Sequence, residues 1–351
     1  MQNPFRRFLR RNAPPPAFRS GRPAEDPPQG SCSPAPPEPP DAFDGPWRLL
    51  SGEVAGGPGE LAQDHQGLVD HLAPLVLGHF SRNRPAPTSF PALAVQIMDL
   101  LNDPDVDLKR VLKAIAPDPA VSLHILRAAN SPWYSRGTEV LDMRIAVMVI
   151  GLRGVSEIAA GVAARSLFDV SLRVEYEVFE DRWRHLFLDT MAVAFGASQF
   201  AFEQQVGRAD RVFLGGMFHD IGKCMALRSL AALSIAGEAP PDLPVRVVDE
   251  VLERTHVEIG CVLHQLWRLP AHLAELCRDH HLPAVPDAPE HMDLHLLRVV
   301  SGIHRLVLDP LDTRCLEETR QSVQTMRLGR RAVRLLSHEM TDQVARVAGL
   351  F

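Results

Sequence analysis

A histidine and an aspartate stand side by side at His219 and Asp220, within the segment FHDIGK at 218–223. An imidazole nitrogen and a carboxylate oxygen at adjacent positions can ligate one ion, and this pair of donors suits Mn, Fe, Zn or Mg. The pair also has a plainer interpretation, in which both groups are buried and only form hydrogen bonds. The apolar residues before it predict a buried helix: Val212, Phe213, Leu214 and Met217.

Four more histidines favour the metal interpretation, because imidazoles on separate helices can converge in the core of a helical bundle. The resulting candidate metal ligands are His185, His219, Asp220, His256, His280 and His281. If the site hydrolyses a phosphate ester, Asp220 and Lys223 are the candidate catalytic residues, with Lys223 steadying the phosphate. The alternative for Lys223 is a solvated side chain near a helix end. His264 and His272 are expected on the surface, because Pro270 interrupts the helical face that they would share.

The elements that must position these residues are predicted to be helices. Past Pro91 apolar residues recur at helical spacing, and no alternating run is long enough to require a sheet, so the predicted class is all-α. Asp107 is a natural N-cap, and the apolar face behind it includes Val111 and Ile115. The segment Asn130, Ser131 and Pro132 should end another helix.

Several motifs occur in an order that resembles a known superfamily. They are WRH at 183–185, FHDIGK at 218–223, HVEIG at 256–260 and DHH at 279–281, which resemble the HD metal-phosphohydrolases. Others resemble one branch of it, the HDOD domain: FPAL at 90–93, LLNDPD at 100–105, DPA at 118–120, LRAANS at 126–131, IGLR at 150–153 and WRLP at 267–270. This resemblance implies a helical HD-like bundle and a regulatory role in bacterial signal transduction.

Two departures from the superfamily limit what the resemblance implies. The related HD-GYP cyclic-di-GMP phosphodiesterases have an Asp-Gly-x-Gly-Tyr-Pro segment after the paired histidines, whereas LPAVP follows His281 here. HD hydrolases also complete the metal shell with a late aspartate, and the matching segment, VVSGIHR at 299–305, has none. His304 is the residue there that could replace it. Loss of a carboxylate weakens the hold on a hard cation.

The chain is expected to divide into four parts. Residues 1–46 are predicted to be a disordered tail, basic at first and then proline-rich, and 47–84 a helical lead-in. The HDOD domain is assigned to 85–310, with an N-terminal helical half at 85–170 and an HD-like half at 171–310. Residues 311–351 form a helical extension that either packs on the core or pairs two chains in a homodimer.

The composition excludes several classes of protein. A net charge of −6 and a pI near 6.2 argue against a broad nucleic-acid-binding face. Five cysteines without a C-x-x-C pair suggest neither a disulfide framework nor a thiolate zinc site, which fits a reducing cytoplasm. The sequence has no apolar run of membrane-spanning length and no signal-peptide block at its start, so neither an integral membrane protein nor a secreted one is expected.

Three functional hypotheses follow from these observations. The first is a non-catalytic signalling module that binds protein partners. The second is a metal-dependent phosphohydrolase acting on a nucleotide or cyclic dinucleotide, in which a metal-bound water attacks phosphorus. The third is a sensor that binds a nucleotide without turnover, using side chains such as Arg184 and Lys223.

Overall fold

The computed structural model describes residues 42–53, 63–85, 96–97, 100, 103, 106–115, 117–135, 137–168, 177–240, 242–310, 312 and 314–351. All regular elements within them are helices, which confirms the predicted all-α class. Disorder is predicted for 1–46; residues 1–41 lie outside the described residues, as does the FPAL segment at 90–93, whereas 42–46 are helical, so the predicted tail extends too far.

The described helices fall into an N-terminal and a C-terminal set. The first set comprises the 3-10 helix η1 (Ala42–Asp44), α2 (Gly45–Leu50), α3 (Gln63–Arg82), α5 (Leu108–Ile115), α6 (Pro119–Asn130), α7 (Met143–Ile150) and α8 (Leu152–Phe168). The second comprises α10 (Glu180–Gln204), α11 (Ala209–Phe218), α12 (Ile221–Ile235), α13 (Val245–Leu266), α14 (Ala271–Asp279), the 3-10 helix η3 (Pro289–His291), α15 (Met292–Leu308), α16 (Leu316–Thr325) and α17 (Arg330–Leu350).

Local sequence explains where the N-terminal helices start and stop. The Asp107 carboxylate accepts a hydrogen bond from the Arg110 backbone N–H (2.8 Å), so Asp107 caps α5 as predicted. Asp118 caps α6 in the same way, and Pro119 at its first position needs no hydrogen-bond donor. This helix ends at Asn130, directly before the predicted stop at Ser131 and Pro132.

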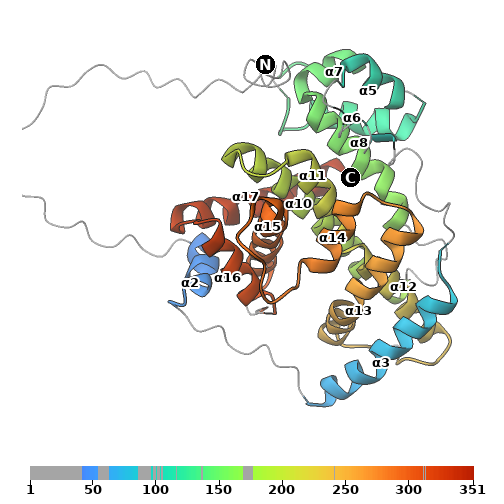
Figure 1. Ribbon diagram of the computed structural model, residues 1–351. Coiled ribbons are helices and arrows are strands. Elements are labelled where there is room, and N and C mark those ends of the chain that lie inside the picture. The colour runs from blue at the N-terminus through green and yellow to red at the C-terminus, as the bar shows by residue number, and fades with distance from the viewer. Residues whose placement is uncertain are drawn as a thin grey trace, which may run out of the picture.

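The helices form two connected groups, which Figure 1 shows at opposite ends of the molecule. Helices α5, α6, α7 and α8 pack together at one end, and α8 also contacts α10 and α11. The larger group is built around α10, α11, α12, α13 and α15. Apolar residues of both groups belong to one continuous core.

The lead-in and the C-terminal extension both pack on the larger group. Helix α3 lies against α12 and α13, while α2 lies against α16 and α17. The Asp44 carboxylate pairs with Arg330 at the start of α17 (2.6 Å). Helix α17 itself packs on α10 and α15 and buries Val333 and Met340. Of the two roles expected for the extension, packing on the core is therefore the one seen in this chain.

The described part of the chain contains no single helix that is both long and apolar enough to cross a membrane. The pair Met143–Ile150 and Leu152–Arg165 meets that criterion only when the two are taken together, and they are bent by 108° relative to each other.

Candidate functional site

His219 and Asp220 lie at the junction between α11 and α12. The apolar residues before the pair predict that it lies within a buried helix. Instead, α11 ends at Phe218 and α12 begins at Ile221, so the pair occupies the turn between them. His219 is buried, and its Nδ1 is hydrogen-bonded to the Gly216 carbonyl oxygen (2.9 Å). This bond directs Nε2 toward the Asp220 carboxylate, 3.5 Å away.

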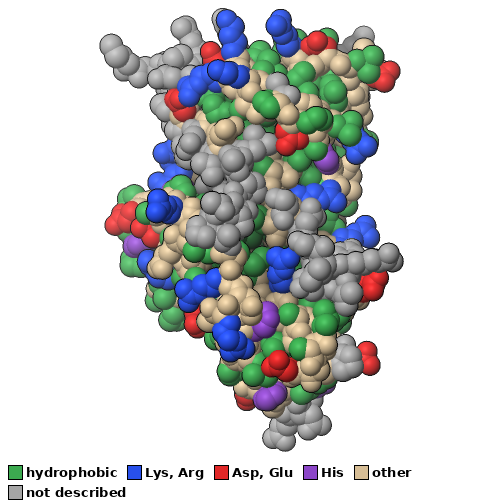
Figure 2. All heavy atoms as spheres, turned by 90° about the vertical axis from the view of Figure 1, so that its right-hand side faces the viewer, with side chains coloured by type: hydrophobic (Ala, Val, Ile, Leu, Met, Phe, Trp, Pro, Cys, Tyr) green, Lys and Arg blue, Asp and Glu red, His purple; other side chains and the backbone are tan. Residues whose placement is uncertain are grey.

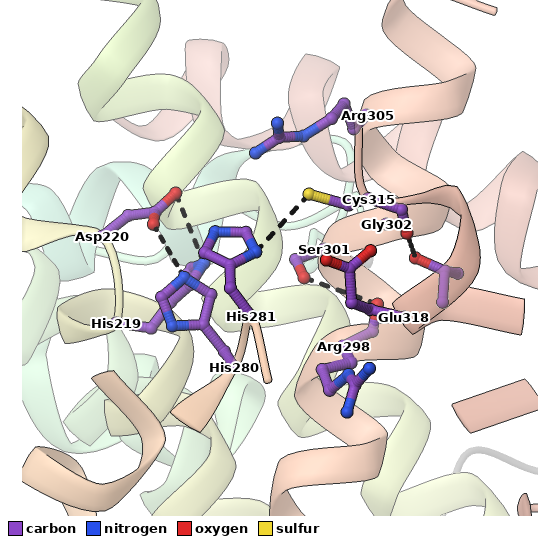
Figure 3. Close-up of a pocket in the computed structure, with 11 residues that line it drawn as sticks. His219, Asp220, His280, His281, Arg298, Ser301, Gly302, Arg305, Cys315 and Glu318 are labelled. Carbon is purple, nitrogen blue, oxygen red and sulfur yellow. Dashed lines mark hydrogen bonds and ion pairs between the residues drawn. The ribbon is translucent and has the colours of Figure 1, made fainter. Parts of the chain in front are cut away.

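Three further histidines surround Asp220. His256 comes from α13, while His280 and His281 follow α14. The Nε2 atoms of His256 and His280 lie 3.2 Å and 3.4 Å from Asp220 Oδ1 and 3.2 Å from each other. Asp220, His256, His280 and His281 each offer one ligand atom, and these atoms lie within 4.8 Å of one another. Figure 3 shows Asp220, His219, His280 and His281 at one side of the pocket.

Hydrogen bonds to the backbone determine which nitrogen of each ring faces the centre of this group. His256 Nδ1 contacts the Glu253 carbonyl oxygen (2.8 Å) and His280 Nδ1 contacts that of Cys277 (2.8 Å), so both Nδ1 atoms are donors. Burial lowers the pKa of His256 to about 4, so its ring is neutral at pH 7 and Nε2 carries a lone pair. Lone pairs of His256, His280 and Asp220 therefore converge, an arrangement that needs a cation, a proton or a water between them.

The donor atoms of this group fit a divalent metal ion. Asp220 Oδ1 and His281 Nε2 are buried and have no hydrogen-bond partner within the structure described. Nitrogen and carboxylate oxygen donors at these separations suit Zn, Mn or Fe. Asp220, His256, His280 and His281 would hold the ion.

A buried lysine and a half-buried arginine balance the charge of the group. Lys223 Nζ donates to Asp220 Oδ2 (2.7 Å) and to Glu253 Oε1 (2.6 Å), and Arg305 Nη2 lies 2.9 Å from the same Glu253 oxygen. Lys223 is 8% exposed, so the expectation of a solvated side chain is wrong. Its carboxylate partners account for this burial, since an ammonium group is buried only when it is paired. Glu253 and Arg305 are not among the residues predicted from the sequence.

This pairing keeps both carboxyl groups ionised. Burial by itself would raise the pKa of Asp220, but its interactions with His219 and with the Lys223 ammonium group outweigh burial and hold that pKa well below 3.8. For Glu253 burial likewise acts to raise the pKa, and Arg305 and Lys223 lower it well below 4.5. The Lys223 pKa is raised, because its two carboxylates outweigh burial.

Two of the predicted ligands are not among the four converging residues: His219, which lies beside Asp220, and His185. His185 is exposed on α10 and is not among the residues whose ligand atoms converge. Asp189, one helical turn further along α10, lies 3.2 Å from Nε2 of the buried His304, although its own side chain is 38% exposed. Here α10 supplies the carboxylate and α15 the imidazole. Asp189 stands four residues after His185 and therefore on the same side of α10, and only the packing of α10 decides which of the two contacts a buried residue.

The surface positions expected for two other histidines are not what the structure shows. His264 is 1% exposed, and its Nε2 lies 3.3 Å from the Phe218 carbonyl oxygen, directly before His219. His272 is half-buried. Burial lowers the pKa of both groups, that of His272 to about 4. Contacts between helices account for this burial. His264 on α13 reaches the carbonyl oxygen at the end of α11, and α14, which carries His272, packs against α11.

A cavity of about 20 Å³ adjoins the histidines. Its far side is formed by α15 and by residues near the start of α16: Arg298, Ser301, Gly302, Arg305, Cys315, Glu318 and Thr319. Cys315 Sγ lies 3.6 Å from His281 Nδ1, and burial raises the pKa of this thiol to about 11. Residues beyond 310, which were assigned to an extension, therefore contribute to the site.

Solved structures of other proteins share the fold of this chain. The chain is similar to a provisionally named metal-dependent phosphohydrolase from Shewanella amazonensis SB2B, with 21% identity, a TM-score of 0.57 and coverage of 81% of this chain and 100% of that one. It is also similar to an HDOD domain protein of unknown function from Geobacter sulfurreducens, with 22% identity, a TM-score of 0.55 and coverage of 81% and 99%.

A relative found by sequence is an uncharacterized protein from Treponema pallidum (strain Nichols), 26% identical over 204 residues. The match covers 57% of this chain and 38% of the relative. The family model of the HDOD domain matches residues 88–283, which is more than half of the chain. The match includes His219, Asp220, His256, His280 and His281, so the convergent histidine and aspartate group lies inside the matched region. The chain belongs to the HDOD domain family.

Proposed function

We propose that this protein is a regulatory module of a signalling pathway that binds protein partners and does not hydrolyse a nucleotide. The observation that carries this proposal is the size of the cavity beside Asp220. At about 20 Å³ it has room for a small ion or water molecules, whereas pockets for drug-sized ligands span roughly 300–1,000 Å³. A nucleotide would need α15 and α16 to move away from the histidines.

The charge arrangement supports the same conclusion. Asp220 and Glu253 share the Lys223 ammonium group, and Glu253 also pairs with Arg305. A hydrolase needs carboxylates whose charge is available to a metal ion and its bound water. Here much of that charge is already neutralised by fixed cations of the protein.

The N-terminal helical half offers surface for a protein partner. Exposed apolar side chains are found there at Leu123, Leu141, Ile145 and Met148. Figure 2 shows hydrophobic side chains reaching the surface at this end of the molecule, among lysines and arginines. Apolar surface of this kind often marks interaction sites.

A turnover assay tests the proposal. The full chain, loaded with Mn, Fe or Mg, is incubated with nucleotides and cyclic dinucleotides beside an Asp220→Ala variant. We expect the two proteins to give the same background. Hydrolysis by the wild type that the variant lacks would contradict the proposal. In a parallel pull-down, partners should remain bound with His219→Ala and in the presence of chelator.

A metal-dependent phosphohydrolase is the second candidate, and one observation favours it. The converging lone pairs of His256, His280 and Asp220 fit a divalent ion. Such an ion would supply Lewis acidity and lower the pKa of a bound water. Asp220 and the histidines would hold the ion, and Lys223 would keep Asp220 ionised and in place. Metal content of wild type, compared with His219→Ala and Asp220→Ala, measures whether this group takes up an ion at all.

A further inference from the structure

Arg298 is a buried arginine for which the described protein provides no partner. It lies on α15, is 2% exposed, and none of its three guanidinium nitrogens makes a hydrogen bond. A guanidinium is a permanent cation with five N–H donors, and a buried charge is normally paired. A buried, unpaired guanidinium group destabilises the folded state unless an anion pairs with it.

The surroundings of Arg298 form one wall of the cavity. Ser301, Gly302 and Arg305 follow it at helical spacing, so all four lie on one face of α15, and all line the cavity. Gly302 lets α16 approach closely, because a β-carbon at residue 302 would lie 1.9 Å from Thr319 Oγ1. Figure 3 shows Arg298 and Ser301 on the side of the pocket away from Asp220.

Two charged groups near Arg298 bear on its role. The carboxylate of Glu318, half-buried on α16, also lines the cavity and acts on Arg298 through its charge, but no ion pair joins the two. The second arginine, Arg305, is already engaged by Glu253. Arg298 therefore has all three guanidinium nitrogens unused, whereas on Arg305 only Nη1 lacks a hydrogen bond, and Glu318 is the group that would compete with an incoming anion.

We propose that Arg298 and Ser301 form a subsite for a phosphate-type oxyanion in this cavity. The Ser301 hydroxyl makes a long contact with the Arg298 carbonyl oxygen (3.5 Å), which it would exchange for the anion. A guanidinium and a hydroxyl can then donate together to tetrahedral oxygens, and Arg is well suited to bidentate contacts with phosphate. At about 20 Å³ the cavity holds roughly one water-sized group, so one oxygen of the anion would enter it and a nucleoside would stay outside. The anion is either free phosphate or the exposed terminal group of a phosphomonoester.

This inference deepens the proposed function, since it names a ligand class for the same cavity, and it can fail separately. Phosphate binding without turnover fits both ideas. Absence of phosphate binding overturns the inference and leaves the regulatory role in place, while turnover that depends on Asp220 overturns the regulatory role alone.

The test is calorimetric titration of the full chain with inorganic phosphate at constant ionic strength, repeated with a nucleoside monophosphate. We expect saturable binding by wild type and a loss of about tenfold or more in affinity for Arg298→Met, the scale of a lost charge-assisted hydrogen bond. Arg331→Met, at an exposed arginine on α17, is the matched control and should bind as wild type does. Tighter binding of the monophosphate than of phosphate identifies an ester as the source, and the reverse identifies the free ion.

Glu318→Gln decides between this subsite and a hidden ion pair, and it also serves if Arg298→Met fails to fold. If Arg298 awaits an anion, removal of the competing carboxylate should tighten phosphate binding by about threefold or more. If Arg298 instead pairs with Glu318 in solution, the variant should lower the melting temperature without tightening phosphate binding. That result, or no saturable binding by wild type, overturns the proposal.

Discussion

A β-carbon at residue 222 would lie 1.9 Å from the carbonyl oxygen of His256, so Gly222 lets two helices meet where the site is assembled. The contact joins the first turn of α12, next to Asp220, to the part of α13 that carries His256. Because the obstructing atoms belong to the backbone, no side-chain rotation can make room. The glycine thus sets how closely the aspartate and the histidine approach.

Gly222→Ala should force α12 and α13 apart and destabilise the fold. Overpacking of this kind costs typically about 1–3 kcal/mol, and backbone contact places this case at the upper end or beyond. Urea unfolding of the purified chain measures the change. Gly67→Ala is the control, because Gly67 is exposed on α3 with no atom within 4 Å of the added carbon. Equal free energies of unfolding for the two variants would contradict the proposed contact.

Lys223→Met should raise metal uptake while it lowers stability. Without the ammonium group, Asp220 and Glu253 lose the cation that they share, which leaves more negative charge for a divalent ion. Breaking a buried pair in this way costs about 3–5 kcal/mol. Metal per chain after zinc incubation and desalting, together with urea unfolding, measures both effects. Lys109→Met, at an exposed lysine of α5, should change neither. Less zinc in Lys223→Met than in wild type would show that Lys223 helps to hold the site open for metal.

Glu339 gives a pH dependence that is independent of the histidine group. The Gln199 Nε2 atom donates to Glu203 Oε1 and to Glu339 Oε1, both at 2.9 Å, which brings two carboxyl groups together between α10 and α17. Burial, followed by the charge of Glu203, raises the pKa of Glu339 from 4.5 to about 7. A raised carboxyl pKa means that the folded state holds a proton which the unfolded state has released, so its stabilising effect is full below about pH 4.5 and is lost as pH rises through 7.

Glu339→Gln should therefore remove this loss. Relative to wild type, the variant should gain stability at pH 8 and show little or no gain at pH 4.5, as measured by urea unfolding at both values. Glu290→Gln, at an exposed carboxylate of η3, controls for the change in net charge. A difference between Glu339→Gln and wild type that does not vary with pH would refute this assignment.

Met340 tests whether α17 is part of the core. Its side chain is fully buried, and its sulfur lies 2.5 Å from where a β-carbon at Gly196 of α10 would be. Met340→Ala should cost about 2–5 kcal/mol in unfolding free energy through lost burial and the cavity left behind. Leu335→Ala, on the same helix but 57% exposed, should stay within about 0.5 kcal/mol. Similar small losses in both would mean that α17 is only loosely attached.

The sequence by itself determined the class of fold, the family and most of the candidate ligands. Helical periodicity and caps such as Asp107 can be recognised in the sequence, because each depends only on residues within a turn or two of one another. His219, Asp220, His256, His280 and His281 could be named in advance because their motifs occur in a recognisable order. None of these signals required knowledge of which helices touch.

Only the tertiary structure decided which side chains face the site. His185 and Asp189 stand one turn apart on α10, and the packing of α10 leaves the first exposed and places the second beside His304. Lys223, Glu253 and Arg305 meet from three helices, and Arg298 is buried on α15 without a hydrogen-bond partner for its guanidinium group. Burial and long-range pairing arise from contacts between residues far apart in the chain, which local spacing does not encode.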